Sequence, residues 1–245
     1  MPAYQTIRLK KTRKQAEITL NHPPLNIIGF EMMSELSEAL GECGDCRILI
    51  LSTALDHFST GVDVRIHTPD LAGKMLDEFH AIIRKLYSLP CLTLCAIRGY
   101  ALGGALELAI CCDVVAAHKS SVLGFPEITI GCFPPVAAVL LPRLIGGNAN
   151  ALLYGGETIS AQKAQEIGLV HALYEDDLQN VVDHYASLSS DALRSIKRVL
   201  RNTADFDFND ALSKSERIYK DELLKSPDVV EGVKAFLEKR KPRFS

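Results

Sequence analysis

The stretch Arg98-Gly-Tyr-Ala-Leu-Gly-Gly-Ala-Leu-Glu-Leu-Ala109 decides how the middle of the chain folds. The apolar run before it, residues 91–97, predicts a buried strand, and the pattern after Gly104 predicts a helix that ends near Cys112. Another strand is predicted over residues 113–117. Strand, helix and strand in this order form a βαβ unit, so we predict an α/β fold with short connections.

The chain before this stretch continues the same alternation of strands and helices. Alternating apolar residues predict strands over 4–10 and 15–20, which the basic turn at 11–14 joins into a hairpin. A helix is predicted over 30–40 and a buried strand over 47–52. An amphipathic helix follows, whose apolar face runs from Met75 to Leu86 and which Pro90 stops.

The chain after Pro135 is mostly helical in pattern, and a short strand near residues 168–172 is the only predicted interruption. We therefore predict an α/β core over residues 1–190 and an all-helical region over residues 191–245. The apolar stripes of the helical region need cover, which either its own core or another subunit supplies.

The composition is that of a globular protein. Of the 245 residues, 47% are hydrophobic and 23% are charged, which excludes a disordered chain. Lys and Arg number 27 against 30 Asp and Glu, so no basic surplus favours nucleic acid or an anionic membrane as a partner. The first 20 residues carry basic side chains where a signal peptide needs an apolar stretch, and we expect a cytoplasmic protein.

Seven cysteines lie mostly within apolar stretches, and we expect most of them to be reduced core residues. The pair Cys43-Gly-Asp-Cys46 has the spacing of half a zinc site or of a redox motif. No second pair completes a ligand set, so a turn before a strand is the favoured interpretation and no metal is expected. The histidines show no metal-ligand spacing either. A surface position is favoured for His67, and an approach to the pocket is the alternative, because its loop follows the segment that carries Val62.

Two carboxylates stand in apolar surroundings. Glu107 follows Gly104 by three residues in the first turn of the predicted helix, and Glu127 lies in Leu123-Gly-Phe-Pro-Glu-Ile-Thr129. A carboxylate is costly to bury unless it is paired or takes part in chemistry. The alternatives are a helix N-terminal stabilising role for Glu107 and a surface loop for Glu127.

Glycines mark two further places where backbone N–H groups become available. The pair Gly103-Gly104 opens a helix, and neither a dinucleotide fingerprint nor a P-loop is formed there. Free N–H groups at such a junction bind an anion or an oxyanion. In His57-Phe-Ser-Thr-Gly-Val-Asp63, Gly61 permits a backbone conformation that turns the Val62 N–H inward.

Together these stretches resemble the crotonase, or enoyl-CoA hydratase/isomerase, superfamily. The resemblance covers nearly the whole chain, from Asn21-His22-Pro23 to the ending that runs from Val230 to Phe244. It implies a crotonase-like ββα spiral core, a helical C-terminal trimerisation region, and homotrimers or homohexamers built as dimers of trimers. It also implies an acyl-CoA thioester as the substrate and no further cofactor.

The resemblance assigns roles to particular residues. It places the oxyanion hole on the backbone N–H groups of Val62 and Gly104, and the two catalytic carboxylates on Glu107 and Glu127. Glu107 would activate water and Glu127 would exchange a proton with the acyl carbon, with the reverse assignment as the alternative. The predicted substrate-binding residues are Gly61, Asp63, Gly103, Phe133 and Pro134. Arg65, Lys239, Arg240, Lys241 and Arg243 would meet the CoA phosphates or form a solvated charged tail.

The sequence departs from the family in two places. Ala105 follows the glycine pair where a third glycine is frequent, and Phe133-Pro-Pro-Val-Ala-Ala138 stands where Pro-Gly and small residues are usual. Because proline and valine are stiffer and bulkier than glycine, the acyl pocket is predicted to differ from that for a simple straight chain. This segment and Leu123-Gly-Phe-Pro-Glu127 are most similar to the cyclic dienoyl-CoA hydratases of anaerobic aromatic degradation. The alternatives are a generic enoyl-CoA hydratase, an isomerase, and a non-catalytic acyl-CoA-binding protein.

Overall fold

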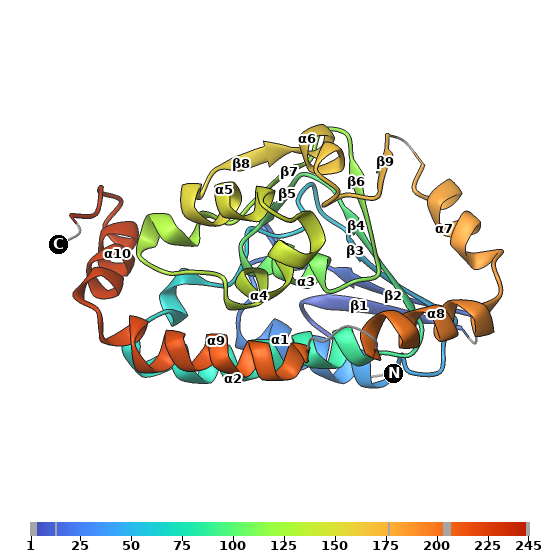
Figure 1. Ribbon diagram of the computed structural model, residues 1–245, viewed down its shortest axis with the longest axis horizontal. Helices are drawn as coiled ribbons and strands as arrows, with labels where there is room; N and C mark the ends of the chain where they lie inside the picture. The colour runs from blue at the N-terminus through green and yellow to red at the C-terminus, as the bar shows by residue number, and fades with distance from the viewer. Residues whose placement is uncertain (1–3, 13, 176, 203–206, 244–245) are drawn as a thin grey trace.

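The computed structural model describes residues 4–12, 14–175, 177–202 and 207–243 (Figure 1). Strands β1 (Ile7–Lys11) and β2 (Gln15–Leu20) form the predicted antiparallel hairpin, with Ile7 opposite Leu20. Arg13 of the predicted basic turn and Phe244 of the C-terminal motif lie outside the described residues.

The larger sheet has the order β1-β2-β3-β4-β6-β9. Its other strands are β3 (Ile48–Thr53), β4 (Leu92–Ile97), β6 (Val114–His118) and β9 (Ala172–Tyr174), and every pairing after the hairpin is parallel. All six residues of β4 are buried, since a parallel sheet is covered on both faces. One face packs on the main core, and the other lies under residues 178–193. The predicted α/β fold is confirmed.

A second, smaller sheet was missed by the sequence interpretation. It joins β5 (Tyr100–Leu102), β7 (Val122–Gly124) and β8 (Thr158–Ser160). Strands of three residues are too short to show a periodic pattern. The strand predicted near residues 168–172 begins only at Ala172, because Gly168 adopts a φ of +83°, which does not fit a strand.

The helices of the first two thirds surround the glycine-rich stretch. Helices α1 (Phe30–Gly41) and α2 (Pro69–Ser88) pack on each other, and α3 (Gly104–Ile110) packs on α4 (Pro135–Ile145). Helices α5 (Asn148–Gly155) and α6 (Ala161–Glu166) complete the layer beside the small sheet. Two short 3-10 turns also occur. The turn η1 (Val64–Ile66) directly follows the segment that carries Val62, and η2 (Pro126–Ile130) lies just before Cys132.

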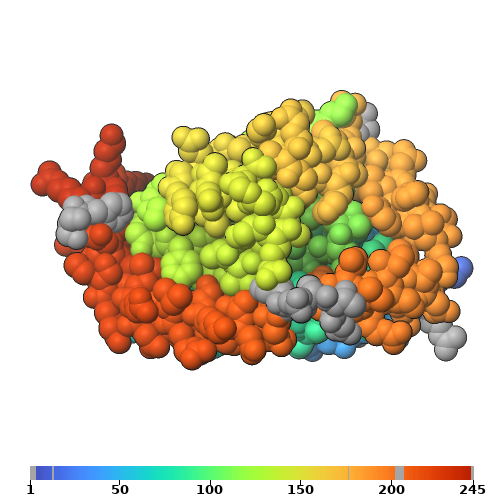
Figure 2. Space-filling view, in the orientation of Figure 1, coloured from blue at the N-terminus to red at the C-terminus, as the bar shows by residue number. Residues whose placement is uncertain are grey.

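After β9 the described chain forms helices α7 (Gln179–Ala186), α8 (Ser190–Asn202), α9 (Phe208–Asp221) and α10 (Pro227–Leu237), with a short turn η3 (Leu223–Lys225). Helix α7 precedes the predicted helical region over residues 191–245. Helix α9 packs against α4 and α2 of the same chain. Figures 1 and 2 show it along one long edge of the molecule, with α10 at the end. The sequence left open whether the apolar faces of residues 191–245 pack on the chain's own core or on another subunit. Helix α9 packs on the core of its own chain.

The seven cysteines are free and buried. Cys43 and Cys46 lie in a turn before β3, as predicted, and the Cys46 thiol donates to the Cys43 carbonyl oxygen at 3.0 Å. Among the described helices, none is long and apolar enough to cross a membrane.

Candidate active site

Two backbone segments are held side by side at the ends of β3 and β5. Parallel bridges join Ile28 to Val62 and Ser59 to Ala101. The buried Ser59 hydroxyl donates to the Asn26 carbonyl oxygen at 2.6 Å and accepts from the Gly61 N–H at 3.0 Å, which fixes the turn before Val62. Neither Asn26 nor Ser59 was singled out in the sequence, because a polar residue in a loop gives no signal of such bracing.

The two predicted oxyanion donors lie on these segments. Gly61 adopts a φ of +101°, and a Cβ on it would lie 3.7 Å from the Gly104 nitrogen, so the two segments nearly touch. Gly104 is the first residue of α3, where N–H groups lack intrahelical acceptors. The N–H groups of Val62 and Gly104 donate to no group of the described chain. Both amides are therefore left without an acceptor within the described residues.

Gly103 connects the amide pair to the second carboxylate. Its φ of +53° lies in the left-handed region, and a Cβ on it would stand 2.6 Å from Glu127 Oε1. Only glycine meets both the backbone and the space requirement at this position. The Glu127 carboxylate therefore lies directly against the turn that presents the Gly104 amide.

Glu107 is buried, at 3% exposure, in α3. Its Oε1 accepts from the N–H groups of Val136 and Ala137, at 2.8 and 2.9 Å, in the first turn of α4. The N-terminal interaction anticipated for this carboxylate thus exists, but with the neighbouring helix and not with its own. Burial raises the pKa of Glu107 to about 7, although the two N–H donors oppose that shift.

Glu127 lies in η2; the residue as a whole is half-buried, while its Oε2 is buried and has no hydrogen-bond partner among the described residues. Burial, and then the charge of Glu107, raise its pKa to about 8. The two carboxylates therefore interact electrostatically, and each exchanges its proton near neutral pH. A shared cavity with two such groups is suited to general acid–base chemistry.

All of these groups open into one cavity of about 620 Å³. Each predicted site residue lines it: Gly61, Val62, Asp63, Gly103, Gly104, Glu107, Glu127, Phe133 and Pro134. The Asp63 carboxylate is already engaged, since it accepts from the Arg65 backbone N–H at 2.9 Å and pairs with the Arg65 guanidinium at 2.6 Å. The Asp63 carboxylate is therefore occupied by Arg65 at the cavity wall.

The basic residues predicted to meet CoA phosphates separate into two groups. Arg65 and Lys239 line the cavity, and the Arg65 side chain is 74% exposed. Arg240 instead pairs with Glu231 at 2.6 Å and with Glu238 at 2.7 Å. The described side chains of Lys241 and Arg243 are exposed and do not line the cavity.

Three further residues line the cavity that the sequence analysis did not assign to the site. The favoured surface position for His67 is wrong: the residue is 9% exposed, lines the cavity, and places Nδ1 at 3.0 Å from the Asp63 carbonyl oxygen, because η1 turns the ring inward. His80 of α2 and Tyr219 of α9 also line the cavity. The Tyr219 ring packs 5.2 Å from that of Phe133, so the C-terminal region closes one wall.

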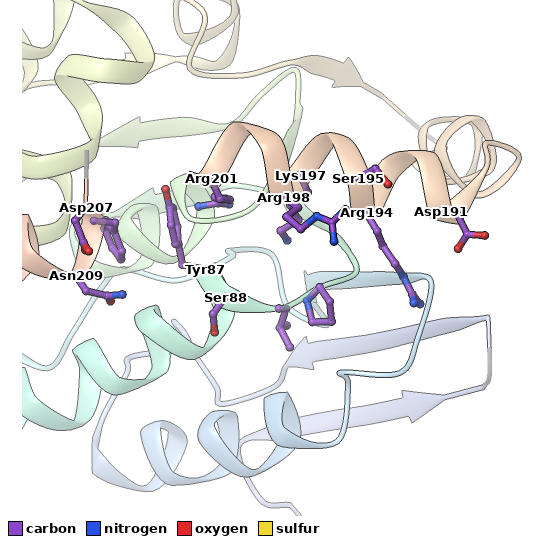
Figure 3. A pocket seen from close by; sticks show the side chains of 13 residues that line it. Tyr87, Ser88, Asp191, Arg194, Ser195, Lys197, Arg198, Arg201, Asp207 and Asn209 are labelled. Atoms are coloured by element: carbon purple, nitrogen blue, oxygen red, sulfur yellow. The ribbon is translucent and has the colours of Figure 1, made fainter. Parts of the chain in front are cut away.

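A second cavity, of about 830 Å³, is larger but lacks this chemistry (Figure 3). It lies between α8, the end of α2 and the start of α9, and is lined by Arg194, Lys197, Arg198 and Arg201. Lys197 and Arg201 both pair with Asp113, and the Arg201 guanidinium stacks on Tyr87. Its basic side chains mainly fasten α8 to the core, so we place the chemistry in the smaller cavity.

Comparisons with known proteins agree with this arrangement. The family profile described as "Enoyl-CoA hydratase/isomerase" matches residues 11–245. A cyclohexa-1,5-dienecarbonyl-CoA hydratase of Thauera aromatica is 35% identical over 240 residues, covering 95% of this chain and 93% of that protein. A probable enoyl-CoA hydratase of Bacillus subtilis is 31% identical, covering 94% of each chain.

A solved structure shares the fold over its full length. The crystal structure of an enoyl-CoA hydratase/isomerase from Xanthobacter autotrophicus Py2 superposes with a TM-score of 0.86 at 27% identity, covering 99% of this chain and 100% of that one. The crotonase-like core predicted from the glycine and glutamate motifs is thereby confirmed. The chain belongs to the enoyl-CoA hydratase/isomerase, or crotonase, family of acyl-CoA enzymes.

Proposed function

We propose that the protein is a hydro-lyase that hydrates cyclohexa-1,5-diene-1-carbonyl-CoA to 6-hydroxycyclohex-1-ene-1-carbonyl-CoA in anaerobic aromatic degradation. The observation that carries the proposal is a single cavity that holds two buried carboxylates and a pair of free backbone amides. The choice of a cyclic diene is supported by the Thauera aromatica relative and by the stiff Phe133-Pro134-Pro135 segment in the cavity wall.

The first requirement of the reaction is an electrophilic thioester. In the proposed complex, the thioester oxygen accepts hydrogen bonds from the Val62 and Gly104 N–H groups. Charge moves onto this oxygen as water attacks, and a fixed donor of this kind commonly stabilises it by about 3 kcal/mol. The braced turns around Gly61 and Gly103 keep both donors in place before the substrate binds.

The second requirement is a base and an acid on one side of the ring. Glu107 takes a proton from water, whose oxygen bonds to the ring carbon β to the thioester carbonyl. The electron pair of that double bond moves into a dienolate on the thioester oxygen. Glu127 then protonates the far end of the dienolate, which leaves one double bond conjugated with the thioester, as in the named product. The oxygen and the new hydrogen enter at the two ends of the diene, so atoms and charge balance.

This scheme needs no metal or redox group, because the two amides polarise the thioester carbonyl and the two carboxylates carry out the proton transfers. Arg65 and Lys239 at the cavity would contact the phosphates of the CoA moiety. The expected cofactor requirement is therefore none beyond the CoA carried by the substrate, and activity is expected to survive dialysis against a chelator.

A generic enoyl-CoA hydratase is the second candidate, and the Bacillus subtilis relative favours it. The mechanism is unchanged except that the proton goes to the carbon next to the thioester. An isomerase would need only one of the two carboxylates, and a non-catalytic acyl-CoA-binding protein would need neither. The raised pKa values of both Glu107 and Glu127 favour a hydratase over these alternatives.

The test is to incubate the purified protein with cyclohexa-1,5-diene-1-carbonyl-CoA and with crotonyl-CoA, following ultraviolet absorbance and product mass. Addition of one water to the diene, lost in Glu107→Gln and in Glu127→Gln, is expected. Hydration of crotonyl-CoA but not of the diene would contradict the cyclic substrate and would support a straight-chain enoyl-CoA substrate instead. No turnover of either compound would contradict the hydratase proposal.

We also propose a homotrimer or a homohexamer, with the region over residues 191–245 at subunit contacts. Helix α8 points its charged side inward, where Lys197 is 8% exposed and bonds to Asp113 at 2.7 Å. Its apolar Ile196 and Leu200 are 56% and 69% exposed. Such a helix needs an apolar partner outside the chain. Native mass spectrometry checks the subunit number, and a monomer at micromolar concentration would contradict the proposal.

We place this enzyme in the cytoplasm, because seven free thiols suit a reducing compartment. Fractionation of the source cells, followed by immunodetection, checks the location.

A further inference from the structure

The first turn of α4 holds Glu107 because this helix has no cap of its own. Its N-cap residue, Pro134, offers no side-chain acceptor, and Pro135 has no N–H group. The next two N–H groups, those of Val136 and Ala137, both donate to Glu107 Oε1. Helix N-termini favour negative charge, so this contact stabilises the ionised carboxylate. The position of α4 therefore affects the proton affinity of Glu107.

The same contact orients the carboxylate. Oxygen Oε1 of Glu107 is occupied by the two N–H groups, and no described residue donates to Oε2. Because two donors hold one oxygen, the carboxylate does not rotate freely and the second oxygen keeps one direction. Proton transfer depends on such fixed orientation. Whatever holds the start of α4 thus also orients Glu107.

Helix α9 holds the start of α4 from the C-terminal region. Ser215 is 8% exposed, and its hydroxyl donates to the Pro135 carbonyl oxygen at 3.1 Å. One turn further along α9, the Tyr219 ring lies 5.2 Å from the Phe133 ring. Residues four apart share one face of a helix, so Ser215 and Tyr219 contact the same segment. A single face of α9 therefore holds the residues that lead into the first turn of α4.

Helix α9 is in turn fixed on α2 by the residue next to Ser215. Glu216 Oε1 lies 2.8 Å from both His80 Nδ1 and Arg84 Nη1 of α2. An ionised carboxylate only accepts hydrogen bonds, so both nitrogens donate to it. His80 is completely buried, and such a shielded contact is screened little by salt. The Ser215 hydroxyl is therefore presented from an anchored turn of α9.

We propose that Ser215 is a positioning residue: its bond to Pro135 keeps the first turn of α4 on the Glu107 carboxylate. Ser215 does not line the cavity, so it acts through α4 and not on the substrate. The inference rests on the proposed function only for the role of Glu107 as the base, since the hydrogen bonds that carry it involve no substrate. Loss of the serine hydroxyl loosens the two N–H contacts and raises the proton affinity of Glu107.

Three other ionisable groups interact electrostatically with Glu107. They are Glu127 of η2, Tyr219 of α9 and Cys111 at the end of α3. Burial keeps the pKa values of Tyr219 and Cys111 well above their usual ranges, so both are neutral near pH 7. Of these groups, only Glu127 titrates in the same range as Glu107. A change at Ser215 alters none of them directly.

The first test is the pH dependence of kcat/KM with cyclohexa-1,5-diene-1-carbonyl-CoA, or with crotonyl-CoA if that alone is hydrated. In Ser215→Ala, the acidic limb near pH 7 should move to higher pH, because Glu107 must be ionised to act as the base. We expect a shift of about half a pH unit, which is about a threefold rise in proton affinity. Ser215→Thr keeps the hydroxyl and should retain the wild-type limb.

Ser121→Ala is the matched control. The Ser121 hydroxyl is also buried and also donates to a backbone carbonyl oxygen, that of Ile97, at 3.3 Å. Neither residue lines the cavity or contacts α4 through a hydrogen bond. The control removes a bond of the same kind, so its acidic limb should stay in place. A merely structural role of Ser215 would likewise leave the limb unmoved.

The second test needs no substrate. The effect of Glu107→Gln on the unfolding free energy is measured at pH 5 and at pH 9, in the wild type and in Ser215→Ala. A carboxylate with a raised pKa destabilises the protein as pH rises, so the gain from Glu107→Gln grows with pH. In Ser215→Ala this growth should be larger by about 0.7 kcal/mol, the same threefold change in proton affinity.

An unmoved acidic limb in Ser215→Ala, or an equal growth with pH in both backgrounds, would overturn the inference. Failure of the proposed function is separate from this. A protein that hydrates neither thioester loses the proposed function, and the unfolding test then decides the inference alone. A protein that hydrates the diene without any dependence on Ser215 keeps the proposed function and loses the inference.

Discussion

Replacing Glu107 by glutamine should change the pH dependence of stability in a defined direction. The carboxylate is buried at 3% exposure, and its pKa is raised from 4.5 to about 7. A folded protein that holds the proton more tightly than the unfolded chain loses stability as pH rises from the unfolded pKa through the folded one. The stability that Glu107 contributes is therefore complete below pH 4.5 and lost above about pH 7.

The size of the effect follows from the shift. One pKa unit corresponds to about 1.4 kcal/mol, so a shift from 4.5 to about 7 predicts a loss of about 3 kcal/mol between acidic and alkaline pH. A neutral glutamine can still accept from the Val136 and Ala137 N–H groups through its amide oxygen. It also removes the charge that helps to raise the pKa of Glu127, which acts in the same direction. The unfolding free energy of the Glu107→Gln variant, relative to that of the wild type, should thus increase as pH rises.

The assay is urea unfolding of both proteins from pH 5 to 9, at matched protein concentration and ionic strength. Because the other titrating groups are common to both proteins, the difference in unfolding free energy reports the Glu107 site together with its effect on Glu127. We expect this difference to shift by about 3 kcal/mol in favour of the variant over this range. A difference that stays constant with pH would contradict the raised pKa of the buried Glu107 carboxylate, on which the mechanism depends.

Three further predictions concern activity. A plot of kcat/KM against pH should be bell-shaped with limbs near 7 and 8, because the Glu107–Glu127 pair must hold one proton; a flat profile from pH 6 to 9 would contradict this. Gly103→Ala should lower kcat about 100-fold by displacing Glu127, while Gly44→Ala, where a Cβ meets nothing within 4 Å, should have no effect in the same steady-state assay. Arg65→Ala and Lys239→Ala should raise KM for the CoA thioester several-fold, with kcat unchanged and with a weaker dependence on salt; a fall in kcat alone would argue against phosphate contacts.

Much of the fold could be predicted because the long elements carry strong periodic patterns. Strand β2 and helix α1 were located to within a residue, and β4 was recognised as a continuous apolar run. The small sheet could not be found, since strands of three residues show no period and are defined by partners elsewhere in the chain. The burial of α9 on its own core also depends on tertiary packing and not on its amphipathic pattern.

The candidate site divides in the same way. Gly103, Gly104 and Glu107 lie close together in sequence, so their chemistry is visible as a motif. The interaction of His80 with Glu216 joins residues 136 positions apart, and neither residue differs in pattern from an ordinary helix position. His67 was misplaced for a related reason, because its inward orientation follows from the hydrogen bond to the Asp63 carbonyl oxygen and from the turn η1. Residues that line a cavity from different helices leave no local signal.

The structure bears on a question that the motifs left open, namely which glutamate is the base. Both carboxylates are buried, but Glu107 Oε1 accepts two N–H donors from the first turn of α4, whereas Glu127 Oε2 accepts none from the described residues. Hydrogen bonds to the charged form favour ionisation. When the pair holds a single proton, that proton therefore resides mainly on Glu127. For the proposed reaction we therefore assign Glu107 as the ionised group that receives a proton from water and Glu127 as the acid that donates one to carbon.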